Sequence, residues 1–241
     1  MTGTIVDMHC HTTNGASDSA LTPSELIEVA QRIGLTGVNV SEHDRVWDRY
    51  TLAKFREESG MFVCPGMEVS TDLGHIIAIG LPEYLPGIRR ATELRKALDN
   101  VGGYMIVAHP FRHWFDPVTF RRNGKEPPVM TPENMAKLEV FQLVDAVEVL
   151  NGANTPRENR FALEVANLLG KPGTGGSDAH SNSGVGIYTA VFEKQLTSLE
   201  EMLVELHARR FKPSLGLPDG KLRPFSLDEF VTPESARVAA P

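Results

Sequence analysis

Short runs of β-branched and other apolar residues alternate with capped helical segments along most of the chain. Strands are predicted at residues 5–11, 36–41, 61–64, 75–80, 104–108, 146–150, 173–176 and 189–192. Clusters of Gly, Pro, Asn and Asp separate these runs, as is typical of turns. Strands that alternate with helices indicate βαβ units and a mainly parallel sheet, so the pattern predicts an α/β fold.

The predicted helices begin with a recurring signature. Residues 22–25 read Thr-Pro-Ser-Glu, which places threonine at the N-cap, proline at the first helical position and glutamate in a capping box. Apolar residues then follow at helical spacing until Gly34. A similar signature predicts helices over 155–169 and 197–210. Seven or eight strands separated by such helices indicate a closed or nearly closed barrel.

Composition is that of a globular chain without a membrane segment. The chain has 241 residues, of which 41% are hydrophobic, so a full core can be buried. No apolar run approaches the ~18 residues that a bilayer-spanning helix needs. The N-terminal residues also lack the basic and apolar segments of a signal peptide. We therefore expect a cytoplasmic protein that does not bind membranes.

Charge and cysteine content narrow the classes of partner. Two cysteines, Cys10 and Cys64, are too few for a disulfide framework. The formal net charge of −7 argues against strong electrostatic binding of nucleic acid. It does not exclude a small anionic substrate, because bound divalent cations would reverse the local field.

Side chains that can bind metals lie at one end of the predicted strands. His9 and His11 are two residues apart on one strand, so both point to the same face while Cys10 points away. Asp178 and His180 repeat this spacing near the other end of the chain. The further candidates are Asp18, His43, Glu68, His75 and His109. Most of them follow an apolar run, where the carboxyl ends of parallel strands converge in barrel enzymes.

The joint pattern favours a metal site with more than one ion. A single histidine after a strand is more often structural, and Asp18 could be a simple turn residue. Together, however, the nine candidates exceed the four to six ligands of one ion. Mixed imidazole and carboxylate ligands suit zinc, manganese or iron. Two or three ions that share a bridging carboxylate are an arrangement typical of phosphate ester cleavage.

Four short motifs resemble those of a known family. They read DMHCHT at 7–12, SEHD at 41–44, AHP at 108–110 and GSDAH at 176–180. They are similar to the four signature motifs of the PHP (polymerase and histidinol phosphatase) superfamily, and the resemblance covers about residues 5–215. The segment DAVEVLNG at 145–152 also resembles the strand before the last motif in stand-alone PHP phosphoesterases.

The resemblance implies a distorted (β/α)7 barrel over residues 1–215, with 216–241 as a C-terminal tail that could pack on it. It also implies a trinuclear site of zinc, manganese or iron ions. One ion would be held by His9, His11, Glu68 and Asp178, a second by Glu68, His75 and His109, and a third by Asp18, His43 and His180.

Three residues are candidates for catalytic roles. Glu68 is expected to bridge two ions. Asp44 follows His43 and could orient a ligand or move protons, although a local helix-capping role would explain it equally well. Arg112, three residues after His109, could bind a substrate phosphate, and a solvated loop arginine is the alternative.

The predicted function is hydrolysis of a phosphate ester, a small phosphomonoester or a nucleotide, by a metal-activated hydroxide. No covalent enzyme intermediate is required. One alternative is an exonuclease that acts on short oligonucleotides, and another is a non-catalytic metal-binding PHP module. A metallohydrolase of the amidohydrolase type is a further alternative, but it would usually use a metal-bridging lysine, and none lies in these motifs. The sequence does not indicate an oligomeric state.

Overall fold

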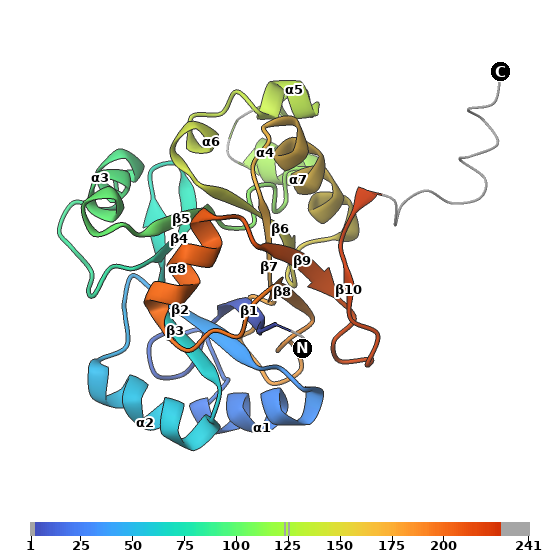
Figure 1. Cartoon of the computed structure of the whole chain (residues 1–241). Coiled ribbons are helices and arrows are strands. Elements are labelled where there is room, and N and C mark those ends of the chain that lie inside the picture. Colours follow the sequence, from blue (N-terminus) through green and yellow to red (C-terminus); the bar gives the residue numbers. More distant parts are fainter. Residues whose placement is uncertain (1–2, 123, 125, 228–241) are drawn as a thin grey trace.

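A computed structural model describes residues 3–122, 124 and 126–227 (Figure 1). Within this part of the chain the strands are β1 (Ile5–Cys10), β2 (Gly37–His43), β3 (Phe62–Thr71), β4 (Gly74–Ile79), β5 (Tyr104–Val107), β6 (Ala146–Asn151), β7 (Gly173–Gly176), β8 (Tyr188–Phe192), β9 (Phe211–Leu215) and β10 (Arg223–Pro224). The helices are α1 (Pro23–Ile33), α2 (Arg49–Ser59), α3 (Ala91–Val101), α4 (Pro117–Arg122), α5 (Pro132–Met135), α6 (Val140–Leu143), α7 (Pro156–Leu168) and α8 (Leu199–His207).

The strands form one strongly curled sheet in the order β10-β9-β8-β1-β2-β3-β4-β5-β6-β7. The curl brings the end of β7 back to β1. The Asp178 amide donates a hydrogen bond of 2.7 Å to the His9 carbonyl, and the His11 amide donates one of 3.0 Å to the Ala179 carbonyl. The strands therefore enclose a half-barrel with helices around it (Figure 1). The α/β class and the distorted barrel are confirmed.

The sheet is less parallel than the sequence predicted. Four neighbouring pairs within the described residues are parallel, namely β1–β2, β2–β3, β5–β6 and β6–β7. The other five pairs are antiparallel, among them β3–β4 and β4–β5. Two residues, Asp72 and Leu73, join β3 to β4. So short a connection allows a hairpin but not a crossover, which excludes a parallel pair at this point.

Apolar packing closes one end of the half-barrel. Met8 and Ile106 line its interior together with Met202 and Leu206 from α8, and all four side chains are fully buried. Helix α8 therefore covers the end at which β1 and β5 begin (Figure 1). Outside the sheet, α1 and α2 pack on β1–β3, and α3 and α7 pack on β4–β6. The candidate metal ligands predicted from the sequence lie at the opposite end of the half-barrel.

Several helix boundaries follow from the capping residues. Thr22 and Glu25 form the predicted capping box at the start of α1, and Gly34 ends the helix with a φ of 77°. Thr155 forms the same box with Glu158 at the start of α7. These boundaries are confirmed. Helices α2 and α3 were not predicted from the sequence.

Two strands carry irregularities next to the polar end. The register of β1 against β2 shifts between Asp7 and Cys10, and that of β6 against β7 shifts beside Glu148. An extra residue of this kind bends a strand and turns its side chains to new directions. In β1, Met8 lies in the interior core and its neighbour His9 still turns inward, toward Glu148.

The end of the described chain extends the sheet. Strand β10 pairs with β9, and Phe225 is buried beyond it. Residues 228–241 of the predicted tail lie outside the described residues, and the domain boundary at residue 215 stays a prediction. None of the helices in the described part of the chain combines the length and apolar character that a membrane span requires.

The close approach of β7 to β1 leads to a first prediction. A Cβ atom on Gly176 would lie 2.4 Å from the Cβ of His9, so Gly176→Ala must push the two strands apart. We expect a loss of about 1–3 kcal/mol in the free energy of unfolding, measured by denaturant titration. Asn182→Ala, at an exposed position, is the control. An unchanged unfolding midpoint in Gly176→Ala would contradict the close contact.

Candidate metal centre

The nine predicted ligands meet at the end of the half-barrel that lies opposite α8. They are His9 in β1, His11 directly after it, Asp18 before α1, His43 at the end of β2, Glu68 in β3, His75 in β4, His109 after β5, and Asp178 and His180 after β7. His75 lies at the start of its strand and still joins the others, because β4 runs antiparallel to β3. The structure thus brings all nine residues into one cluster.

Glu68 occupies the middle of this cluster and is 1% exposed. Its Oε1 atom lies 2.9 Å from Nδ1 of His75 and 3.0 Å from Nε2 of His109. Its Oε2 atom lies 3.0 Å from Nδ1 of His43 and 3.3 Å from Nε2 of His11. Each carboxylate oxygen therefore faces a different pair of imidazoles, which is the geometry that a bridging carboxylate needs.

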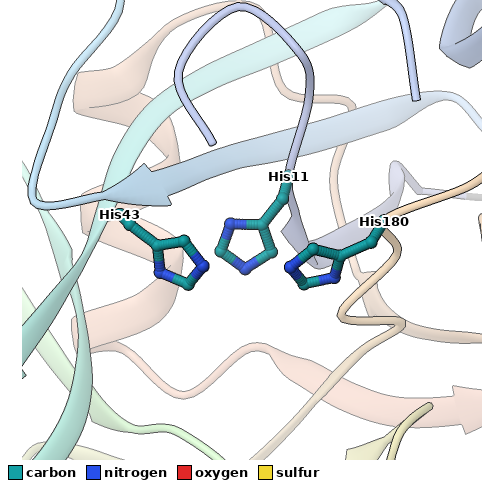
Figure 2. A group of neighbouring side chains, drawn as sticks. All are labelled: His11, His43 and His180. Atoms are coloured by element: carbon teal, nitrogen blue, oxygen red, sulfur yellow. The ribbon is translucent and has the colours of Figure 1, made fainter. Parts of the chain in front are cut away.

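Three smaller groups can be distinguished by the separation of their ligand atoms, which lie within 4.8 Å of one another. They are His9, His11 and Asp178; His9, Glu68 and His109; and His11, His43 and His180. Figure 2 shows the third group, with the His11 ring between those of His43 and His180. The ring centroids of His43 and His180 lie 4.3 and 4.4 Å from that of His11.

The grouping overlaps with the predicted division but is not identical to it. The sequence placed Asp18 with His43 and His180 in one site. The Asp18 carboxylate does approach both rings, at 3.3 Å and 3.5 Å, but its side chain is 58% exposed. His11, fully buried, is the more enclosed partner of these two rings. The division of ligands among ions therefore stays a prediction.

The chemistry of the donors fits a metal ion. Nε2 of His9 and Nε2 of His11 lie 2.9 Å apart, and both side chains are fully buried. Oδ1 of Asp178 lies 3.6 Å from the first nitrogen and 3.3 Å from the second. Lone pairs that converge in this way repel one another unless a proton or a cation lies between them. The buried clusters of imidazoles and carboxylates are consistent with a metal site.

Comparisons of the sequence with known proteins find matches to PHP-associated sequences and to nucleic-acid enzymes. Residues 156–211 match a family described as PHP-associated. A protein of Methanocaldococcus jannaschii, named as uncharacterized, is 27% identical over an alignment of 114 residues that covers 44% of this chain and 67% of that protein. The error-prone DNA polymerase of Cutibacterium acnes is 28% identical over 42% of this chain and 7% of the polymerase. A 5′-3′ exoribonuclease of Haemophilus influenzae is 29% identical over 38% of this chain and 34% of the nuclease.

Two solved structures have a similar fold. A candidate metal-dependent phosphoesterase from Bifidobacterium adolescentis has a TM-score of 0.52 at 19% identity, over 83% of this chain and 95% of that one. PsfC from Pseudomonas syringae has a TM-score of 0.60 at 16% identity, over 91% and 95%. The four motifs lie at the polar end of this shared fold. In its motifs, in residues 156–211 and in its fold, the chain is similar to proteins of the PHP superfamily.

The electrostatics of this site favour positive charge between its carboxylates. Burial alone would lower the pKa of His9, but the carboxylates of Glu148, Asp178 and Glu68 raise that pKa well above its ordinary value. Burial alone would raise the pKa of Glu68, but the charge of His9 and hydrogen bonds from neighbouring imidazoles hold it well below its usual range. A divalent cation can supply the same compensation in place of protons.

Glu148, to which the sequence analysis gave no role, holds two of the candidate ligand residues, His9 and His109, in place. This fully buried carboxylate accepts a hydrogen bond of 2.9 Å from Nδ1 of His9 and one of 2.8 Å from the His109 amide. The Asn151 side chain also donates to it, at 2.9 Å. A carboxylate behind an imidazole fixes the tautomer and orientation of a metal ligand. A single acid within the apolar run AVEVL was the signal that could have identified it.

Two further buried acids hold the segments that carry ligands. Asp7 accepts hydrogen bonds from the Ser177 amide, at 2.8 Å, and from the Ser177 hydroxyl, at 2.5 Å, and so ties β1 to the turn before Asp178. Glu42 accepts from the Thr12 hydroxyl, at 2.5 Å, and so holds the start of the loop that leads to Asp18. The PHP motifs thus contain structural acids next to the candidate ligands.

Backbone strain is concentrated around the cluster. Asp44, His109 and Asp178 have φ values of 49°, 29° and 53°, a region that residues other than glycine rarely adopt. Each such residue costs about 1–3 kcal/mol and persists only where its surroundings hold it. Here the Asp178 amide bonds the His9 carbonyl and the Asp44 amide bonds the Glu68 carbonyl. The strained residues Asp178 and Asp44 are therefore held by hydrogen bonds to β1 and β3, the strands that carry His9 and Glu68.

Arg112 lies at the cluster. Its Nη2 atom forms an ion pair with Asp178 and donates a hydrogen bond of 2.8 Å to Oδ1 of Asn151. Its Nε atom donates a bond of 3.3 Å to Oδ1 of Asn154. The side chain is 24% exposed, so a freely solvated loop arginine is not what the structure contains. Its binding of phosphate stays a prediction.

Asp44 lies beside the cluster rather than in it. Its carboxylate accepts a hydrogen bond of 2.6 Å from Arg89 and one of 3.2 Å from the Ser70 amide. The helix-capping alternative is wrong, because Asp48 is the N-cap of α2. A catalytic role for Asp44 stays a prediction.

The support from Glu148 leads to a second prediction. Glu148→Gln keeps the size of the side chain but removes the charge behind His9. We expect metal affinity to fall by about 10- to 100-fold while the fold is retained. Titration of metal against a competing chelator would measure the affinity, and Glu57→Gln at an exposed position on α2 is the control. Equal affinities in the two variants would contradict this role of Glu148.

Proposed function

We propose that this chain is a metal-dependent hydrolase of phosphate esters. The observation that carries the proposal is the position of Glu68, whose two carboxylate oxygens face imidazoles from β2, β4 and the segments after β1 and β5. Arg112, a side chain suited to a phosphate, lies at the same cluster. A cluster with a bridging carboxylate and a neighbouring guanidinium suits phosphate ester hydrolysis better than a purely structural role.

The metals are proposed to be three divalent ions, of zinc, manganese or iron. His9, His11, Glu68 and Asp178 would hold the first, while Glu68, His75 and His109 would hold the second, and Asp18, His43 and His180 would hold the third. When bound, such ions supply a water of lowered pKa and positive charge for the phosphoryl oxygens.

The protein's own groups would hold the substrate and orient the site. Arg112 can donate to phosphoryl oxygens, and Asn151 and Asn154 fix its guanidinium in place. Glu148 keeps the His9 ring in one orientation through its Nδ1 atom. These contacts pre-organise the site before the substrate arrives, which is the main contribution that a protein makes to phosphoryl transfer.

The proposed substrate is a small phosphomonoester or a nucleotide. The net charge of −7 gives a long nucleic acid little electrostatic attraction. The second candidate is an exonuclease on short oligonucleotides, and its support is the 29% identity to the H. influenzae protein named as a 5′-3′ exoribonuclease, of which the matched segment is 34%. A non-catalytic metal-binding module would also gather the nine candidate ligands, but it gives no reason for Arg112 to lie beside them.

A phosphate-release assay over phosphomonoesters, nucleotides and short 5′-phosphorylated oligonucleotides tests the function, with manganese, zinc and iron supplied in turn. Glu68→Gln should lower turnover by about 100-fold or more, because the bridging charge is lost, while circular dichroism shows a retained fold. Glu57→Gln is the matched control. Nucleotide release from the oligonucleotides alone would favour the exonuclease, and no hydrolysis under any condition would overturn the proposal.

A comparison of His9→Ala with Arg112→Ala separates metal binding from substrate binding. His9→Ala should lower metal content and turnover together. Arg112→Ala should keep its metal and lose about 10- to 1000-fold in kcat/KM, as expected for a charged contact to the reacting group. Metal analysis of the purified variants provides the second readout. Loss of metal from Arg112→Ala would show that Arg112 supports the metal ligands instead. Unchanged kinetics would show that Arg112 does not bind the substrate.

A further inference from the structure

A cavity of about 540 Å³ adjoins the candidate metal centre. His75, His109 and Arg112 line it and also belong to the metal cluster or contact it. Its volume is in the range of sites that bind small molecules. This cavity is therefore a candidate place for the organic group of an ester whose phosphate lies at the cluster.

The walls of the cavity are mainly apolar. They include Leu73, Val107, Trp114, Leu138, Val140 and Phe141. Trp114 is held edge-on against two other rings, with centroid distances of 5.8 Å to Phe111 and 6.0 Å to Phe120. The indole is thus fixed before a ligand arrives, and a fixed aromatic wall favours a flat apolar group.

Charge on the cavity walls disfavours a second anion. The acidic lining residues, Asp72 and Glu139, are both exposed. Apart from the two histidines, Arg112 is the basic residue among those that line the cavity. It already forms an ion pair with Asp178. A carboxylate or a second phosphate on the organic group would be repelled by these two acids.

We propose that this cavity binds the organic group of the substrate and selects one that is uncharged and apolar, preferably aromatic. The inference rests on the proposed phosphoesterase function and specifies the substrate class. Trp114 would be the main determinant of this selectivity, because it is the largest aromatic side chain among the lining residues.

Two esters with the same reacting bond test the proposal. Ethyl phosphate and 2-phenylethyl phosphate both release a primary alcohol, so the leaving oxygens are alike and the phenyl ring is the difference. We expect kcat/KM for the phenyl ester to be about 10- to 100-fold higher, as burial of a ring should produce. An ester with a terminal carboxylate, 3-carboxypropyl phosphate, should be no better than ethyl phosphate.

A variant assigns the effect to the cavity. In Trp114→Ala, the ratio of kcat/KM for the phenyl and ethyl esters should fall toward one. Tyr50→Ala removes an aromatic ring that is 71% exposed on α2, and it should keep the wild-type ratio. A wild-type ratio near one, or a ratio unaffected by Trp114→Ala, would overturn the proposal.

A binding measurement separates this proposal from the proposed function. 2-Phenylethylphosphonate and ethylphosphonate cannot be hydrolysed, and calorimetry on manganese-loaded protein would compare their affinities. Tighter binding of the phenyl compound by about tenfold or more supports the cavity even if no ester is hydrolysed, in which case the function alone fails. Hydrolysis of both esters with equal affinities and equal kcat/KM would overturn the cavity and leave the function.

Discussion

The buried negative charge of Glu68 is the constraint on which the rest of the site depends. A carboxylate that is 1% exposed costs several kcal/mol unless positive charge or hydrogen-bond donors surround it. Imidazoles from four separate segments provide that surrounding. His75 can take part only because β4 turns back on β3, so the hairpin that breaks the parallel pattern of the sheet is also what completes the cluster.

The half-barrel separates two kinds of packing. At the end covered by α8, Met8 and Ile106 pack against Met202 and Leu206, and this apolar core holds the strand beginnings together. At the other end, the irregularity in β1 lets His9 turn inward directly after Met8. Strained turns follow, and their cost is offset by hydrogen bonds between strands. The well-packed apolar end of the half-barrel thus stabilises a polar end that contains strained backbone.

Much of this arrangement could be predicted from the sequence, and the exceptions have physical reasons. Capping boxes at Thr22 and Thr155 are local signals, so α1 and α7 were found. The prediction of a strand at 61–64 was too short, because Pro65 and Gly66 are typical of a break in the sequence. In the structure β3 passes through both residues and ends at Thr71. Helix α3 was missed because its N-cap, Arg90, makes no side-chain capping bond. The role of Glu148 depends on contacts with His9 and His109 that are distant in sequence.

Arg112 connects the metal cluster with the cavity beside it. A guanidinium has five N–H donors in a planar arrangement. The Nε atom bonds Asn154, and Nη2 bonds Asn151 and Asp178, while Nη1 has no hydrogen bond to the described residues. Asn151 ends β6 and Asn154 lies just before α7, so the two bonds tie the guanidinium to these elements. Under the proposed function, Nη1 would be the donor left for a phosphoryl oxygen. The same side chain lines the cavity, so a phosphate held by Arg112 would place its organic group against Trp114.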